Sequence, residues 1–241
     1  MPDILDEFLF PRRPTAERPL LGQTVLIVED SRFAGETMRL MCLRGGARIR
    51  RADSLRSAAR HLKTYRPTIV VVDLGLPDGS GLDLIRQLSA ASPRVPALLA
   101  VSGDPMQEDA AMRAGADDFL TKPFGSVAAF HAAILSRLPE TAQPQGPRIV
   151  SNEIVVADPS ALGDDYALIM DLLKVENDDT VMAYAASFAI NLAHSTGDAE
   201  LLAAGRAQQT ALTDGERAGD AHGDLGALVR RRMTVDGSLA V

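Results

Sequence analysis

The sequence has little of what several protein classes require. It contains one cysteine, Cys42, so no disulfide can form within the chain, and its place on the apolar side of a predicted helix indicates a small core side chain. The longest apolar runs are far shorter than the roughly 20 residues that span a bilayer. Residues 1–10 lack the basic start and small-residue cleavage site of a signal peptide. We therefore expect a cytoplasmic protein without membrane insertion.

Basic residues are scarce in the second half of the chain. Residues 145–241 carry seven Lys or Arg against fifteen Asp or Glu, a net charge of −8, whereas residues 1–144 carry eighteen against seventeen, a net of +1. A DNA-binding domain normally presents a basic stripe to the phosphates. Only Arg230, Arg231 and Arg232 form a basic cluster here, which is typical of a solvated face. DNA is thus an unlikely partner by charge.

Enzyme signatures are also missing from the second half. It contains no Ser/His/Asp set, no cysteine–histidine cluster and no Walker-type glycine loop. Asp178 and Asp179 lack the alternating oxygen spacing of a calcium loop and are better interpreted as helix caps. We expect no enzyme activity from this region.

The first half contains short apolar runs, each followed directly by polar residues. The runs are residues 25–28, 69–72, 98–101 and 119–120, separated by stretches with helical periodicity. This alternation is typical of a parallel β-sheet with helices on both faces, in which ligands bind at the carboxyl ends of the strands. The polar residues expected together at that edge are Glu29, Asp30, Asp73, Ser102 and Lys122.

Four segments resemble the receiver domain of two-component response regulators. They are V-L-I-V-E-D-S at 25–31, V-V-D-L-G-L-P-D-G-S-G at 71–81, V-S-G at 101–103 and D-D-F-L-T-K-P-F at 117–124. The resemblance implies an α/β fold, a doubly wound five-stranded parallel sheet of the flavodoxin-like, chemotaxis-regulator-like kind with strand order 2-1-3-4-5. It covers residues 21–138 and says nothing about the remainder.

The acids at the expected sheet edge suit a divalent cation and an acyl phosphate. Mg²⁺ prefers oxygen ligands and typically uses one or two carboxylates, here Asp30 and Asp73. Asp73 is the predicted phosphorylated nucleophile. By resemblance, Glu29 would hold metal-bound water and the backbone carbonyl of Gly75 would be a further ligand.

Three residues are expected to respond to the phosphoryl group. Lys122 suits a point-charge clamp on a flexible stem. By resemblance, Ser102 would bond a phosphoryl oxygen and Phe119 would swing from exposed to buried, and the Lys122–Pro123 peptide would be cis. A plainer alternative exists for Asp30-Ser31, which could simply cap a helix from Arg32.

The rest of the chain divides by composition. We predict an N-terminal arm at 1–20, the receiver at 21–138, a proline-rich linker at 139–148, a small, mainly α-helical output domain at 149–212 and a flexible tail at 213–241, with a short helix near 225–232 as an alternative. Residues 149–156 suit a strand pair or an extended arm, and helical patterns begin near Asp164. Two or three helices are predicted, and the clearest patterns run from Asn177 to Gly197 and from Asp198 to Leu212.

His194 ends the first of these helices and could carry a phosphoryl group. Phosphotransfer modules, however, usually have a lysine and a glycine soon after that histidine, and this chain continues Ser-Thr-Gly-Asp. We expect a helix-terminal position favoured by the helix dipole.

The resemblance implies a response regulator phosphorylated by a sensor histidine kinase or a histidine phosphotransfer protein. The helical region would then contact an unknown downstream protein. The expected output face comprises residues 106–114, Phe119 and 126–138, and its alanine-rich last helix suits a homodimer as well as plain helix propensity. Two alternatives remain: a transcription regulator with a divergent helix-turn-helix, and a divergent catalytic output.

Overall fold

The computed structural model describes residues 13–146, 152–155, 157–175, 178–214 and 219–237, and in the last stretch the side chains of 224–234. The expected arm falls largely outside these residues. The strands are β1 (Thr24–Val28), β2 (Arg48–Ala52), β3 (Ile69–Asp73), β4 (Gly75–Leu76), β5 (Gly79–Ser80), β6 (Ala97–Ser102) and β7 (Asp118–Thr121). The helices are α2 (Arg32–Arg44), α3 (Leu55–Thr64), α4 (Gly81–Ala90), α5 (Glu108–Ala114), α6 (Val127–Leu135), α7 (Pro159–Leu172), α8 (Asp179–Thr196), α9 (Ala199–Thr213) and α10 (Gly219–Gly237), with 3-10 turns at Pro105–Gln107 and Glu140–Ala142.

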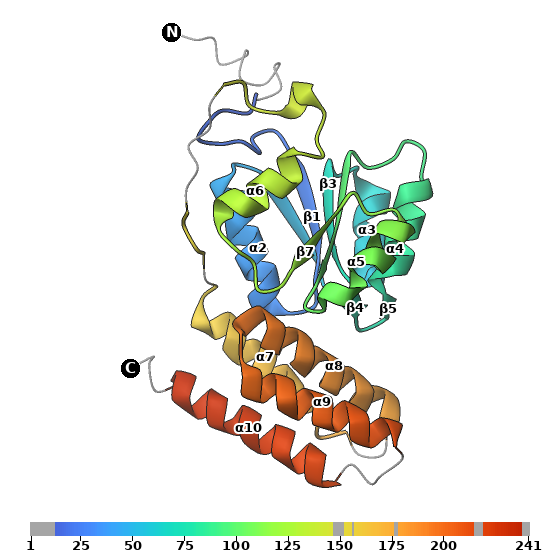
Figure 1. Cartoon of the computed structure of the whole chain (residues 1–241), viewed down its shortest axis with the longest axis vertical. Coiled ribbons are helices and arrows are strands. Elements are labelled where there is room, and N and C mark those ends of the chain that lie inside the picture. The colour runs from blue at the N-terminus through green and yellow to red at the C-terminus, as the bar shows by residue number, and fades with distance from the viewer. Residues whose placement is uncertain (1–12, 147–151, 156, 176–177, 215–218, 238–241) are drawn as a thin grey trace.

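The first half folds around a five-stranded parallel sheet in the order β2-β1-β3-β6-β7. This is the doubly wound α/β fold that the sequence predicts. β3 is buried along its whole length because helices cover both faces of the sheet, which its run of β-branched residues suits. Figure 1 shows α2 and α6 on one face and α3, α4 and α5 on the other.

Alternate residues of the strands pack into two separate cores, one on each face of the sheet. Val71 points to the face shared with Met38 of α2 and Ile134 of α6. Its neighbour Val72 points to the face shared with Ile85 of α4. Because side chains alternate along a strand, each strand serves both layers and its carboxyl end is held in place from two sides.

The second half is a bundle of four helices, α7 to α10. Their apolar sides meet in a third core that includes Tyr166, Ile169, Phe188, Leu192, Leu201, Leu225 and Val229. Asp158, Asp178 and Asp198 cap the starts of α7, α8 and α9, each accepting hydrogen bonds from amides of the first turn. The bundle lies against the end of the α/β half at which α2 begins (Figure 1). No helix among the described residues is long and apolar enough to cross a membrane.

The structure differs from the sequence prediction at the end of the chain. The flexible tail expected at 213–241 contains α10, which buries Leu225, Leu228 and Val229 in the bundle. The helix offered as an alternative near 225–232 is present, and it is longer than expected. Its glycines lower intrinsic helix propensity, and packing against α7 and α9 overrides that preference. Arg232 of α10 also pairs with Asp198 at 2.8 Å.

The segment before the bundle is an extended arm, one of the two expected possibilities. Residues 152–155 form no strand; instead the Val127 amide donates to the Glu153 carbonyl at 2.9 Å. Arg44 pairs with the Glu153 carboxylate at 2.8 Å, and Val155 is buried in the core shared by α2 and α6. Residues 152–155 therefore run along the α/β half before α7 begins at Pro159.

Candidate functional site

Three acids meet at the carboxyl edge of the sheet. Glu29 and Asp30 follow β1, and Asp73 ends β3, its immediate neighbour, with Val28 in register with Val72. One carboxylate oxygen from each acid lies within 4.8 Å of the others. Glu29 and Asp73 are each 1% exposed. The capping alternative for Asp30-Ser31 is confirmed for Ser31, which is the N-cap of α2 and accepts from the Ala34 amide. Asp30 instead accepts from the Tyr184 hydroxyl.

Lys122, which directly follows the edge strand β7, reaches the same cluster. Its ammonium lies 2.7 Å from Glu29 Oε2 and 3.0 Å from Asp73 Oδ1, and its side chain is fully buried. The Lys122 amide donates to the Ser102 carbonyl, which ties the residue to the end of β6. The Lys122–Pro123 peptide is cis, as predicted. One ammonium thus lies in a cluster with three acids, of which Glu29 and Asp73 are buried and Asp30 is partly buried.

The imbalance of charge shifts the protonation of the cluster. Burial raises the pKa of Glu29 well above its usual value, although Lys122 opposes this. Burial and the nearby Asp73 raise the pKa of Asp30 to about 7. Burial alone would lower the pKa of Lys122, but the charges of Asp73 and Glu29 outweigh it and keep that pKa raised. A further positive charge at this place would reduce the repulsion among the three carboxylates.

The residues present fit a metal ion. Asp30 Oδ1 is buried and has no hydrogen-bond partner among the described residues. The three acids supply only oxygen ligands, which hard divalent cations prefer. The Gly75 amide donates to Asp73 Oδ2 at 3.0 Å, so the loop after β3 already turns around this carboxylate.

The other two predicted site residues lie beside the cluster. Ser102 ends β6 and is 4% exposed, and its hydroxyl oxygen accepts from the Asp104 amide at 3.1 Å. Phe119 on β7 is partly buried and packs against the core shared by α3, α4 and α5. The structure therefore brings all seven predicted residues to the carboxyl edge of the sheet and to β6 and β7. Their roles remain predictions.

The sequence did not predict four bundle residues at this edge. The Tyr184 hydroxyl donates to Asp30 Oδ2 at 2.9 Å, and Asp165 accepts from the Ser31 hydroxyl at 2.7 Å. Asn191 lies over Gly75 and His194 over Gly103, where a Cβ added to either glycine would meet their side chains. The available signal was a polar stripe on an otherwise apolar helix, which ordinarily indicates a solvent-facing side.

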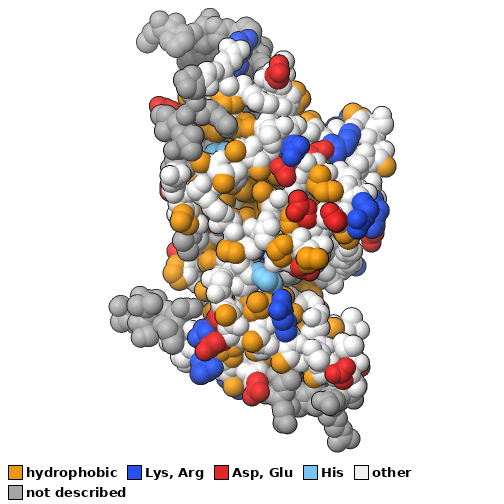
Figure 2. All heavy atoms as spheres, in the orientation of Figure 1, with side chains coloured by type: hydrophobic (Ala, Val, Ile, Leu, Met, Phe, Trp, Pro, Cys, Tyr) orange, Lys and Arg blue, Asp and Glu red, His pale blue; other side chains and the backbone are white. Residues whose placement is uncertain are grey.

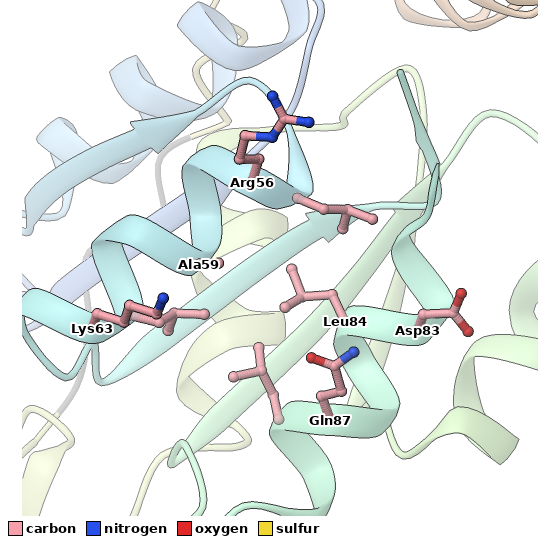
Figure 3. A pocket seen from close by; sticks show the side chains of 9 residues that line it. Arg56, Ala59, Lys63, Asp83, Leu84 and Gln87 are labelled. Atoms are coloured by element: carbon pink, nitrogen blue, oxygen red, sulfur yellow. The ribbon is translucent and has the colours of Figure 1, made fainter. Parts of the chain in front are cut away.

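Cavities lie beside the described part of the α/β half. One, of about 670 Å³, opens beside the acids and is lined by Glu29, Asp30 and Tyr184 among others. The second, of about 490 Å³, lies between α3 and α4, where Leu84 and Gln87 face Arg56 and Lys63 (Figure 3). None of the predicted site residues lines the second cavity.

Comparison with known proteins covers the first half. Residues 25–134 match the family model of the response regulator receiver domain. The KDP operon transcriptional regulatory protein KdpE of Escherichia coli (strain K12) is 38% identical over 101 residues, 42% of this chain and 45% of the relative. The probable transcriptional regulatory protein TcrX of Mycobacterium tuberculosis (strain ATCC 25618 / H37Rv) is 34% identical over 140 residues, 57% of this chain and 60% of the relative.

The chain therefore spans about half the length of the curated relatives it matches. Among solved structures, the receiver domain (CheY-like) from Methylobacillus flagellatus is 32% identical and covers 48% of this chain and 98% of its own, with a TM-score of 0.43. The family expected from the motifs is confirmed for the first half. The relatives are named transcriptional regulators, so they do not support the expectation that DNA is an unlikely partner.

Proposed function

Residues 25–134 form a response regulator receiver domain, and we propose that it accepts a phosphoryl group on Asp73 from a sensor histidine kinase or a histidine phosphotransfer protein. The observation that carries the proposal is the position of Lys122. Its ammonium lies 3.0 Å from Asp73 Oδ1 in a cluster with two further acids. A buried cation beside the predicted nucleophile can balance the charge that a phosphoryl group brings.

The proposed reaction is a transfer from nitrogen to oxygen. A carboxylate oxygen of Asp73 attacks the phosphorus atom, and the P–N bond of the phosphohistidine breaks with its electron pair returning to the imidazole. Lys122 follows the phosphoryl oxygens, and the Ser102 hydroxyl donates to one of them. Hydrolysis of the resulting acyl phosphate resets Asp73. The chain needs no other catalytic activity, so we propose that it is a phospho-accepting signalling protein.

The proposed metal is Mg²⁺, held by Asp30, Asp73 and the Gly75 carbonyl, with Glu29 holding a metal-bound water. When bound, the ion polarises the phosphoryl group and offsets negative charge. Asp30 Oδ1, buried without a partner among the described residues, supports a cation at this place.

The proposed output is a change in protein–protein contacts. When Ser102 turns toward the phosphoryl group, Phe119, which is now partly buried, moves inward and alters the face formed by α5 and α6. The helical region then binds a downstream protein or a second copy of the chain.

A DNA-binding output is a second candidate, because the relatives named above are transcriptional regulators. Charge does not favour it. In Figure 2, Lys and Arg on the bundle lie beside Asp and Glu and form no continuous basic stripe on that face. Retention on heparin that weakens steeply with salt would support this candidate, and passage through the column at low salt would exclude it.

The test of phosphorylation uses acetyl phosphate with Mg²⁺ and intact-protein mass spectrometry. We expect one added phosphoryl group in the wild type and none in Asp73→Asn or after chelation of the metal. The matched control is Asp83→Asn, an exposed acid of α4 that pairs with Arg86. Equal labelling of Asp73→Asn and the wild type would contradict the proposal.

A further inference from the structure

The polar stripe of α8 lies across the phosphorylation edge of the receiver. Tyr184 bonds Asp30 after β1, Asn191 lies over Gly75 after β3, and His194 lies over Gly103 after β6. A Cβ at position 75 would be 2.5 Å from Asn191 Nδ2 and 3.6 Å from Asp73 Oδ2, so the amide and the nucleophile border the same small space. These residues are seven and three apart, which places them on one side of the helix.

Helix α7 supplies a second anchor. Asp165 is 1% exposed and accepts from the Ser31 hydroxyl at 2.7 Å, the Arg32 amide at 2.8 Å and the Phe33 amide at 3.0 Å. The first amides of a helix have no partner within the helix, and its N-terminus favours a negative charge. A bundle carboxylate thus binds the Ser31 cap and the first two amides of α2, which begins two residues after Asp30.

The apolar contact around these bonds is shared. Phe33 of α2 packs against the bundle core that contains Phe188 and Ile169. Asp164 pairs with Arg32 at the rim, where both side chains are more than half exposed. The contact has the form of an apolar centre with polar bonds and a solvated edge, which is typical of specific interfaces.

From this geometry we propose that the helical domain is an intramolecular lid over the phosphorylation edge, and that a divalent cation and the lid compete for Asp30. The inference rests on the proposed function. The Tyr184 hydroxyl donates to Asp30 Oδ2 and so fixes the orientation of a carboxylate whose other oxygen, Oδ1, has no partner among the described residues. A cation that turns this carboxylate to bind it breaks the bond to Tyr184. Binding of the cation with a phosphoryl group therefore releases α8 and exposes its polar stripe.

The lid also distinguishes a protein phosphodonor, which it blocks, from small ions, which it admits. Asp73 and Lys122 are 1% and 2% exposed. A folded protein that carries a phosphohistidine therefore cannot bring the phosphorylated imidazole nitrogen to Asp73 while α8 is docked. The cavity of about 670 Å³ still opens onto Glu29 and Asp30, and ions can enter there. Transfer from a protein donor therefore takes place in molecules whose lid is open, and the bound cation and phosphoryl group then keep α8 from docking again.

The test follows the Arg32 and Phe33 amides of the full chain by NMR hydrogen exchange, with and without Mg²⁺ and beryllofluoride. These amides donate to Asp165, so exchange reports docking directly. We expect at least tenfold faster exchange in the wild type when both ligands are added. Asp165→Ala should exchange at the faster rate without ligands.

Calorimetry of Mg²⁺ alone tests the competition. Tyr184→Phe removes one hydrogen bond to a charged group, and we expect Mg²⁺ to bind about three to tenfold more tightly. The matched control is Tyr65→Phe, because Tyr65 follows α3 and bonds no site residue. A second control, Asp164→Asn, removes only the exposed pair with Arg32.

The outcomes separate the two proposals. If Mg²⁺ and beryllofluoride bind while the Arg32 and Phe33 amides remain protected, and Tyr184→Phe binds Mg²⁺ as the wild type does, the lid is excluded and the phosphorylation proposal stands. If neither ligand binds to any variant and acetyl phosphate leaves Asp73 unmodified, the proposed function fails and the lid inference fails with it.

Discussion

Asp30 illustrates how one residue can serve a site at the cost of stability. It lies beside two other acids, and its unpartnered Oδ1 is buried. The pKa of Asp30 in the folded chain, about 7, lies above its usual 3.8, so the ionised group destabilises the fold wherever the unfolded chain is already deprotonated. Stability should therefore fall as the pH rises from 4 to 7.

Replacing this acid should stabilise the metal-free protein. We expect Asp30→Asn to raise the free energy of unfolding by about 2 kcal/mol at neutral pH in EDTA, because the repulsion and the buried charge are removed. Urea denaturation measures the change. In excess Mg²⁺ the difference should shrink or reverse, since the variant loses a ligand. A variant less stable than the wild type in EDTA would contradict this account.

Gly103 offers a substitution that acts on the lid without touching an acid. A Cβ at this position would collide with the Cβ and ring of His194, which cannot move aside without moving α8. We expect Gly103→Ala to displace α8 and speed exchange of the Arg32 and Phe33 amides at least tenfold without added ligands.

Gly125→Ala is the matched control for this substitution. A Cβ there would meet only the Ala129 Cβ, at an ordinary contact distance of 3.9 Å. Its exchange rates should equal those of the wild type. Equal rates in both variants would show that α8 tolerates a methyl group at Gly103 and is not packed there.

At the scale of elements, α10 determines whether the second half is a three-helix or a four-helix domain. Leu225 is fully buried between α10 and its neighbours. We expect Leu225→Ala to lower the free energy of unfolding of the bundle by about 2 to 4 kcal/mol, the cost of a cavity in a packed core.

Circular dichroism during urea denaturation measures this loss, with Arg230→Ala as the exposed control on the same helix. Similar small effects of both substitutions would favour the flexible tail predicted from the sequence. A large effect of Leu225→Ala alone would establish α10 as part of the core.

For the whole molecule, the position of the bundle predicts a change of shape on activation. Release of the bundle from the edge of the sheet leaves two bodies joined by residues 139–158. We therefore expect a larger radius of gyration in Mg²⁺ and beryllofluoride. Small-angle X-ray scattering measures it, and Asp73→Ala should remain compact.

Light scattering on the same samples distinguishes opening from self-association. A larger radius at unchanged mass indicates lid opening alone. A doubled mass indicates that the released surface, or the α6 face, binds a second copy of the chain. An unchanged radius with both ligands bound would contradict opening at this scale.

Much of the receiver half could be predicted from the sequence because its signals are local. Each run of β-branched residues ends in a polar residue, and parallel strands place their ends at one edge. Glu29, Asp30, Asp73, Ser102 and Lys122 therefore meet where their spacing predicts. The caps of α8 and α9 are equally local, since Asp178 and Asp198 bond amides two and three residues away.

The features of the second half that could not be predicted depend on contacts between residues far apart in the sequence. The glycines of α10 argue against a helix, and only burial of Leu225, Leu228 and Val229 overrides that preference. Tyr184 and Asp30 are 154 positions apart, and no pattern within either segment indicates their bond. From the sequence alone, a polar stripe on a helix predicts a solvent-exposed face, because nothing local shows which surface covers it.

The amino-acid sequence by itself thus determined the parallel sheet, its acidic edge and the starts of two bundle helices, because period, cap and strand end are properties of neighbouring residues. Only the tertiary structure decided that α7 and α8 cover the acidic edge. That choice depends on the fit of Asp165 to the start of α2 and of Tyr184 to Asp30, bonds whose partners come together only when both halves are folded.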